Sequence, residues 1–380
     1  MEKESEKFVE QKKPIIILTI LITILGVLLS LYGFMESEKI FGIRAMTVDS
    51  KGNIYLICDY TLYKLGKEGN IIFSCGKECQ RQGEFGPGIP MDIAVDRDEN
   101  IYVADIGNYR IEKFDKNGEF VFAFGARGTS PGTFGSLIEI AVDNSGNIYA
   151  VDSPNHRLQK FDAKGKLLFA VGKKGVRDEE FDYPHDPFIG KDGKIYVCDY
   201  RNARVQCFDS EGKSIAQYKT TEGKNGMSGI SMIRSYNLPQ RIAGDTKSNY
   251  YLINYDLALV DGYLFKYDTN FKLLKKIDLS HCGIDYLDFP SEIVCSSDGT
   301  LFISQERPMR IDQFGFDGNY FGRFGSKEVL SIFNELKEKR DGYIATQRMG
   351  HILLILGVIF TVVVYWMYKR SLSKSGKRAH

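Results

Sequence analysis

Short runs that alternate hydrophobic and polar residues occupy most of the chain. Four of them follow one another between residues 92 and 125: DIAVD (92–96), NIYVAD (100–105), RIEKFD (110–115) and EFVFAFG (119–125). Runs of this length, rich in β-branched and aromatic residues, are typical of β-strands. Turns such as Asp-Lys-Asn-Gly at 115–118 join them, because glycine accepts the positive φ of a hairpin turn. This stretch therefore predicts a four-stranded antiparallel meander.

The same pattern recurs along the chain. NIYVADIGNYRIEKF begins at Asn100, NIYAVDSPNHRLQKF begins 47 residues later at Asn147, and KIYVCDYRNARVQCF begins after another 47 residues at Lys194. Six such units align at Asn53, Asn100, Asn147, Lys194, Asn249 and Thr300. One meander alone buries too little apolar surface, so repeated units must pack against each other. The repeats predict an all-β fold, a six-bladed β-propeller with four-stranded antiparallel blades.

Two long apolar runs lie outside the repeats. Residues 14–34 read PIIILTILITILGVLLSLYGF, and residues 351–368 read HILLILGVIFTVVVYWMY. Each run is long enough to cross a bilayer as an α-helix. A cleavable signal peptide is the alternative for the first run, but its apolar core is long and no small-x-small cleavage site follows it. We therefore expect two transmembrane α-helices that flank the propeller.

Lysine and arginine residues beside these runs predict the orientation of an integral membrane protein. The outer flanks carry more of them than the inner flanks, which places both termini in the cytoplasm and the propeller on the extracytoplasmic side. The expected organisation is a cytoplasmic N-terminal tail at 1–13, a transmembrane helix at 14–34, the propeller at 41–326, an amphipathic helical linker at 327–349, a transmembrane helix at 350–368 and a basic cytoplasmic tail at 369–380.

The expected linker contains EVLSIFNELKEKR at 328–340, with apolar residues at helical spacing. One interpretation is a helix that packs on the flank of the propeller or continues into the second transmembrane helix. The other is a helix that lies in the membrane interface.

Composition excludes two classes of protein. Hydrophobic residues make up 43% of the chain and charged residues 26%, which is typical of a globular protein and not of a disordered one. The formal net charge is +1, whereas binding a nucleic acid requires clustered lysine and arginine. We therefore expect no nucleic-acid partner.

The repeated motif resembles that of the NHL-repeat family of six-bladed β-propellers. The matching pattern is P-x-D-I-A-V-D-x-x-x-N-I-Y-V-A-D-x-G-N-x-R-I-x-K-F-D, clearest at 87–210 and recognisable at 41–326. The first unit departs from it at Asp59-Tyr-Thr-Leu, and the fifth has Asn254 in place of the aspartate and no arginine. The resemblance implies a binding platform, such as a surface-exposed sensor or an RNA reader, although a related zinc lyase uses the same frame.

Antiparallel geometry separates two faces of such a propeller. The long connections, which we call the loop face, lie at 78–90, 125–137, 173–184, 219–239 and 280–290, and the tight glycine turns form the opposite turn face. Binding usually resides in long loops on a rigid frame. Both ends of the propeller lie on the loop face, so we expect this face to look towards the membrane. Apolar residues in the 219–238 loop and in 256–262 suggest a protein or lipid partner there.

Three Asp/Arg pairs recur at the same spacing in successive units: Asp105/Arg110, Asp152/Arg157 and Asp199/Arg204. A catalytic pair need occur only once, whereas a structural pair recurs in every blade. We therefore expect ion pairs that hold the long hairpins.

A second set of positions lies near the start of each first strand. These positions hold Ala45, Asp92, Glu139, Asp186, Arg241 and Glu292. First strands line the central channel, so the four carboxylates and Arg241 are candidates for a cation or ligand site at its mouth, with Ca²⁺ or Zn²⁺ as the metals considered. The alternative is that these side chains only bond to nearby backbone.

Histidine and cysteine residues give weaker signals. Of His156, His185 and His281 on the loop face, only His185 is expected near the axis, so the three do not converge as a zinc site requires. The seven cysteines lack C-x-x-C spacing, and Cys75 and Cys79 are a candidate disulfide if the propeller is extracytoplasmic.

These observations favour a membrane-anchored, extracytoplasmic platform that binds or assembles a membrane or envelope protein, or a ligand at the channel mouth. A metal-dependent lyase or lactonase-like hydrolase that uses the acidic ring and His185 is the alternative from the enzyme class. RNA binding is less favoured, because it needs a cytoplasmic propeller with a basic loop face.

Overall fold

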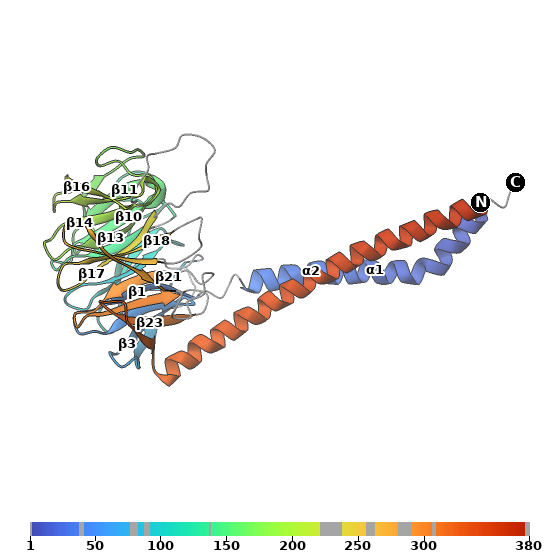
Figure 1. Ribbon diagram of the computed structural model, residues 1–380, viewed down its shortest axis with the longest axis horizontal. Helices are drawn as coiled ribbons and strands as arrows, with labels where there is room; N and C mark the ends of the chain where they lie inside the picture. Colours follow the sequence, from blue (N-terminus) through green and yellow to red (C-terminus); the bar gives the residue numbers. More distant parts are fainter. Residues whose placement is uncertain are drawn as a thin grey trace. The chain divides into compact units, whose positions relative to one another are not determined.

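The computed structural model describes residues 2–37, 42–76, 83–86, 92–136, 138–220, 238–255, 263–279, 290–305 and 309–376. Within this part of the chain, the strands form six four-stranded sheets, each made from four consecutive strands (Figure 1). All neighbouring strands in the sheets are antiparallel. The sequence-based prediction of a six-bladed propeller is confirmed.

The blades follow chain order. Blades 1 to 3 are β1 Ile43–Val48, β2 Ile54–Cys58, β3 Thr61–Leu65 and β4 Ile71–Cys75; β5 Asp92–Val95, β6 Ile101–Asp105, β7 Arg110–Phe114 and β8 Phe120–Phe124; β9 Ile138–Val142, β10 Ile148–Asp152, β11 Arg157–Phe161 and β12 Leu167–Val171. Blades 4 to 6 are β13 Pro184–Ile189, β14 Ile195–Asp199, β15 Arg204–Phe208 and β16 Ser214–Lys219; β17 Leu238–Gly244, β18 Tyr250–Tyr255, β19 Tyr263–Tyr267 and β20 Leu273–Asp278; β21 Pro290–Cys295, β22 Thr300–Gln305, β23 Arg310–Gly315 and β24 Tyr320–Phe324. The short 3-10 helices η1 Ser153–Asn155 and η2 Tyr200–Asn202 follow β10 and β14.

Burial differs from strand to strand within a blade. The second strands, such as β6 and β10, are buried along their whole length, whereas the outer strands β4, β12 and β16 alternate between half-buried and exposed residues. Second strands pack against neighbouring blades on both faces and can be apolar throughout. Outer strands face solvent on one side, so they show the period of two.

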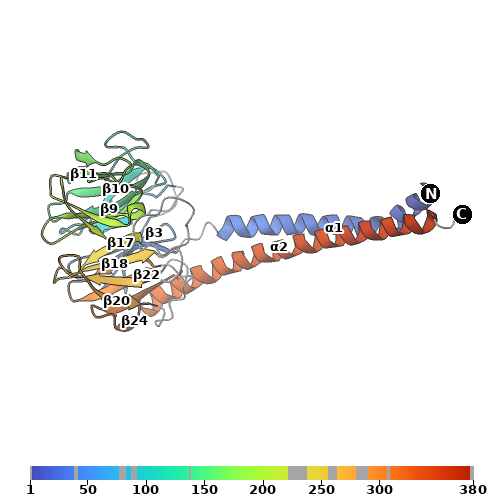
Figure 2. The same ribbon diagram turned by 45° about the horizontal axis from the view of Figure 1, so that its top comes forward.

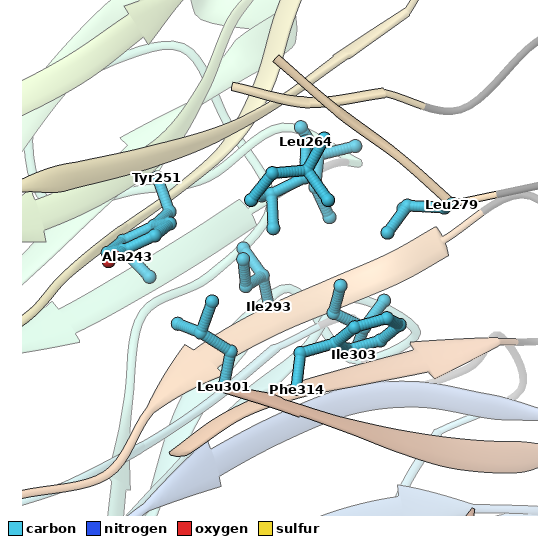
Figure 3. Packing of buried hydrophobic residues seen from close by; sticks show 10 residues of the cluster. Ala243, Tyr251, Leu264, Leu279, Ile293, Leu301, Ile303 and Phe314 are labelled. Carbon is cyan, nitrogen blue, oxygen red and sulfur yellow. The ribbon is translucent and has the colours of Figure 1, made fainter. Parts of the chain in front are cut away.

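The core lies between blades. Figure 3 shows one part of it, where Tyr251 and Leu264 of blade 5 pack against Ile293, Leu301 and other apolar residues of blade 6. A similar cluster joins blade 1 to blade 2 and includes the buried rings of Tyr55, Phe85 and Phe114. Because the apolar surface is shared between neighbours, the blades depend on each other for their burial.

The six inner strands form a closed ring. Each one contacts the next in the order β1, β5, β9, β13, β17 and β21, and β21 contacts β1. At the closure, the Ser291 hydroxyl donates to the Ile43 carbonyl at 2.9 Å. Among the described residues, no strand crosses this junction, since blade 1 consists of the first four strands and blade 6 of the last four.

A second compact unit consists of residues 1–40 and 335–380, which include α1 and all of α2 except its first turns. The two helices are α1, Glu2–Ser37, and α2, Lys327–Gly376, and both are long and apolar enough to cross a membrane. They lie side by side where glycines allow close approach (Figure 2). A Cβ at Gly26 would lie 2.9 Å from the Gly350 carbonyl oxygen, and one at Gly350 would lie 2.3 Å from the Ser30 nitrogen.

The predicted linker is not a separate element, because α2 continues through it without a break. Val329 and Phe333 in the first turns of α2 are buried, within the compact unit that holds the propeller. This agrees with the interpretation of a helix that packs on the propeller and continues into the second apolar run.

Candidate functional site

Strand pairing locates the charged positions around the channel. Asp92 pairs with Ala104, Glu139 with Val151, Arg241 with Ile253 and Glu292 with Ser304, which is the same register in four blades. Blades 1, 4, 5 and 6 each have a β-bulge beside this position. In blade 4 the bulge places His185 opposite Cys198 and leaves Asp186 as the extra residue, whereas in blades 5 and 6 the extra residue precedes Arg241 and Glu292. Asp186 has a φ of 34°, a left-handed value that is unusual for a residue with a side chain.

Glu139 is the centre of this charged ring. Its carboxylate accepts hydrogen bonds from the Asp186 backbone N–H at 2.7 Å and from Arg241 Nη1 at 2.5 Å, and it lies 3.1 Å from His185 Nδ1. Burial alone would raise the pKa of Glu139, but Arg241 and His185 lower that pKa to about 2. Glu139 is therefore an ionised carboxylate in a buried ion pair with Arg241.

Other ring carboxylates bond to backbone amides of the inner strands. Asp92 accepts from the Ile140 N–H of blade 3 at 2.6 Å, and Asp186 accepts from the Ile242 N–H of blade 5 at 2.5 Å. These bonds join neighbouring blades, as the Glu139–Asp186 bond does. The ring therefore holds the blades together at the channel, as in the alternative of backbone bonding.

Three of the ring carboxyl groups lose their protons less readily than a carboxyl group in water, because their pKa values are raised. Burial and the nearby charge of Glu139 together raise the pKa of Asp92 to about 7. Burial also raises the pKa of Asp186 and of Glu292 well above their usual values, although Arg241 opposes the rise. The guanidinium of Arg241 is the cation of the ring, since it also donates from Nε to Glu292 at 3.1 Å.

The arrangement leaves little support for a metal site. In the part of the chain that the structure describes, no three histidine, cysteine, aspartate or glutamate side chains come together in a way that could hold a metal ion. Arg241 stands among the carboxylates that were the candidate ligands. The proposed use of Ca²⁺ or Zn²⁺ stays a prediction.

The channel itself contains a cavity of about 220 Å³. Its walls are mainly apolar residues from all six inner strands, and Asp92, Asp186 and Glu292 line it as well. A cavity of this size, which offers carboxyl groups and other polar atoms beside apolar side chains, is suited to a small ligand.

On the loop face, a cluster of polar and aromatic side chains lies around the start of blade 4. His156 Nδ1 accepts a hydrogen bond from the Tyr183 backbone N–H at 3.1 Å. The Arg201 guanidinium lies 4.3 Å from the centre of the Tyr183 ring, and the His185 ring lies 5.0 Å from that of Tyr200. The cluster extends from the half-exposed Arg201 to the channel, but His156 and His185 do not converge on one point.

The recurrent Asp/Arg pairs lie across the long hairpins. Arg157 contacts Asp152 at 2.9 Å, Arg204 contacts Asp199 at 2.7 Å, and Arg110 Nε lies 3.5 Å from Asp105. Each arginine also reaches carbonyls of the loop that enters its own blade: Glu84 for Arg110, Thr129 and Thr133 for Arg157, and Arg177 and Glu180 for Arg204. The pairs therefore fix the loop-face connections to the frame.

Several expectations fall outside the described residues. These are the 219–238 loop apart from its ends, the 256–262 stretch, His281 and Cys79. Cys75 forms no disulfide with another described residue, and burial raises the pKa of its thiol to about 11. The Cys75–Cys79 pairing stays a prediction.

Sequence reasoning did not single out Tyr183, Arg201 or Asp182. For Asp182 and Tyr183, the signal was the composition of the blade 4 entry, FDYPHDP, which departs from the other units without a change in the 47-residue spacing.

Comparisons with known proteins agree with the fold. A family model described as a 6-bladed beta-propeller matches residues 92–166, and the NHL repeat model matches residues 181–208. No curated protein matches the chain.

Solved structures with the same fold are distant in sequence. Virginiamycin B lyase from Staphylococcus aureus is 12% identical, with a TM-score of 0.51 and with 75% of this chain and 85% of that one covered. A streptogramin B lyase is 14% identical, with a TM-score of 0.51 and coverage of 77% and 85%. At such identities the likeness concerns the fold alone. The chain is a six-bladed β-propeller with an NHL repeat, flanked by two helices long and apolar enough to span a membrane.

Proposed function

We propose that this protein is a membrane-anchored, extracytoplasmic binding platform. The loop face of its propeller would bind a membrane or envelope protein. The observation that carries the proposal is the placement of the propeller between α1 and α2. β1 begins and β24 ends on the loop face, and only a short connection separates Ser37 of α1 from Ile43 of β1. A connection of five residues reaches at most about 18 Å, and this short length supports the proposal.

The chemistry of the ring supports binding over catalysis. Its carboxylates are occupied by backbone amides of neighbouring blades and by Arg241. A general acid or base needs access to a substrate proton, and buried groups that join the blades are poorly suited to that role. The lyase or lactonase alternative therefore has no observation of its own in its favour.

Site-specific photo-crosslinking in intact membranes tests the platform. Probes replace Val176 or Arg201 on the loop face, with Lys164 or Lys213 on the turn face as matched controls. We expect protein adducts from the loop face only, and expect purified partner, once identified, to compete for them. Adducts of lipid and the protein itself alone, or equal adducts from both faces, would count against the proposal.

Orientation is tested separately by a membrane-impermeant maleimide reagent. Lys164→Cys on the propeller should gain a labelled site in intact cells relative to the parent chain, whereas Ser5→Cys and Ser373→Cys in the tails should gain one only after lysis. Labelling of the tails in intact cells would reverse the proposed topology.

A further inference from the structure

The entry into blade 4, residues 182–186, is held in an unfavourable backbone conformation. Tyr183 has a φ of 56° and Asp186 a φ of 34°, and a bulky aromatic residue rarely adopts the left-handed region. Such conformations persist only where neighbouring groups impose them. Here two contacts do so: the Tyr183 N–H donates to His156 Nδ1, and the Asp186 N–H donates to Glu139.

The first of these contacts requires a neutral His156. Since Nδ1 accepts the Tyr183 N–H at 3.1 Å, the ring proton resides on Nε2. A second proton on the ring would occupy Nδ1 and turn it into a donor. It would then face the Tyr183 N–H with no acceptor between them, and the bond that holds Tyr183 would be lost.

An acceptor for that proton lies next to His156. Asp182 Oδ1 is 3.8 Å from His156 Nδ1, and this buried oxygen has no hydrogen-bond partner among the described residues. A protonated His156 can bond to it after a small movement, which would satisfy a buried acceptor that is otherwise costly.

Other charged and titratable groups around His156 modulate this exchange. Arg201 Nη1 lies 3.9 Å from the same Asp182 oxygen and disfavours a second cation. Arg157, the next residue along the chain, is paired with Asp152. On the far side of the Tyr183 ring, His185 contacts the carboxylate of Glu139.

We infer that residues 182–186 form a proton-controlled switch at the mouth of the channel. Protonation of His156 exchanges the Tyr183–His156 hydrogen bond for an ion pair between His156 and Asp182. Tyr183 then leaves the left-handed region, its stacking with Arg201 is lost, and the loop-face surface beside the channel changes. The inference does not depend on membrane attachment.

Hydrogen–deuterium exchange of the full chain in detergent micelles tests the switch. Pro184 has no amide, so the segment 183–185 reports through the Tyr183 and His185 amides. Rates are measured at about pH 8 and about pH 5, the range in which histidine changes charge, and are corrected for the intrinsic pH dependence of exchange. We expect the protection of the Tyr183 amide to fall about tenfold at the lower pH, as the loss of one hydrogen bond implies.

His156→Asn is the central variant. Asparagine tolerates the left-handed φ of 53° at this position, and its side-chain carbonyl accepts a hydrogen bond without titrating. We expect its Tyr183 protection to be the same at both pH values. His185→Asn should retain the response of the unmodified chain. A response that is absent from the unmodified chain, retained in His156→Asn or lost in His185→Asn would overturn the inference.

Asp182→Asn gives an independent check if His156→Asn disturbs the fold. Without the carboxylate, the protonated imidazole loses its partner, so the midpoint of the exchange response should move to lower pH. An unchanged midpoint would overturn the inference.

Discussion

At the scale of single residues, the repeats allow one side chain to be compared with its equivalents in the same molecule. Gln159 of β11 donates from Nε2 to the Thr133 carbonyl at 3.0 Å and accepts the Gly132 N–H at 2.8 Å. Gln206 of β15 makes the same two bonds with the loop of blade 4. Glu112 occupies this position in β7 and is fully buried, but a carboxylate has no N–H to donate. Burial raises the pKa of Glu112 to about 7, although Arg110 opposes the rise.

Glu112→Gln is expected to stabilise the propeller at high pH. The folded state holds the Glu112 proton up to about pH 7, and the unfolded state releases it near pH 4.5, the usual pKa of a glutamate. The unmodified chain therefore loses stability as the pH rises between these values. The difference corresponds to about 3 kcal/mol above pH 7. The melting temperature of the variant should exceed that of the unmodified chain at pH 8 and match it near pH 5. Gln159→Glu is the matched control and should introduce a similar pH dependence into blade 3; an offset that is equal at both pH values would contradict this account.

Arg241→Met is expected to destabilise the ring strongly. It removes the cation that Glu139 and Glu292 share, and the loss of one partner of a buried ion pair costs about 3–5 kcal/mol. Because Arg241 lowers the pKa of Glu139, its removal should let Glu139 take up a proton at higher pH. Melting curves should therefore show a large loss at pH 8 that is partly recovered at pH 5. The double variant Arg241→Met/Glu139→Gln should be more stable than Arg241→Met alone, and strictly additive losses would show that the two side chains are not coupled.

At the scale of elements, the first turn of a blade is fixed by a network that repeats. In blade 3, Asp143 accepts from the Asn147 backbone N–H, from Asn147 Nδ2 at 2.8 Å and from the Tyr149 hydroxyl at 3.0 Å. The same bonds form around Asp49, Asp96 and Asp245 in blades 1, 2 and 5. Lys160 lies 5.0 Å from the Tyr149 ring centre, so the network reaches from the first hairpin to the third strand.

Asp143→Ala tests this network. The change removes the acceptor of several hydrogen bonds, including that of the half-buried Tyr149 hydroxyl, and should lower stability by about 2 kcal/mol or more. Asp162→Ala is the matched control, because Asp162 also accepts two backbone N–H groups in a tight turn of blade 3, but these hydrogen bonds are exposed to solvent. Melting temperature and amide exchange at 143–149 are the measurements. An equal effect of both changes would mean that burial of the network adds nothing.

The sequence predicted the elements better than it predicted the ring. The period of 47 residues predicts the number and order of the blades, because the turn residues and the strand pattern repeat together. The bulge at Asp186 does not change the apolar pattern of β13. Counting residues from the end of the strand therefore could not reveal that His185, and not Asp186, pairs with Cys198. Arg241 and Glu139 are 102 residues apart and meet only through ring closure, and no local pattern encodes such a contact.

At the scale of the whole molecule, the helical unit depends on small residues. α1 and α2 approach each other at Gly26, Gly33 and Gly350, where side chains of any size would meet backbone atoms. In a bilayer, close packing of this kind stabilises helix pairs, because lipid offers no hydrophobic drive for association.

Gly350→Leu is expected to separate the two helices. The Tyr32 and Tyr343 rings lie 5.9 Å apart, so cysteines at these two positions should be joined by a bis-maleimide crosslinker in membranes, and the crosslink measures the approach of the helices. Gly350→Leu should reduce the crosslink yield several-fold, whereas Gly342→Leu should not, since a Cβ at Gly342 would meet nothing within 4 Å. Equal yields in both variants would contradict the packing.

The closure of the ring between blades 1 and 6 has a mechanical consequence. None of the described strands is shared across this seam, where the Ser291 hydroxyl donates to the Ile43 carbonyl and the Ser326 N–H donates to the Gly69 carbonyl. The chain enters at blade 1 and leaves at blade 6, so any tension between its two helices is delivered to the two sides of this one joint. Under such tension, we expect the propeller to open first at this seam.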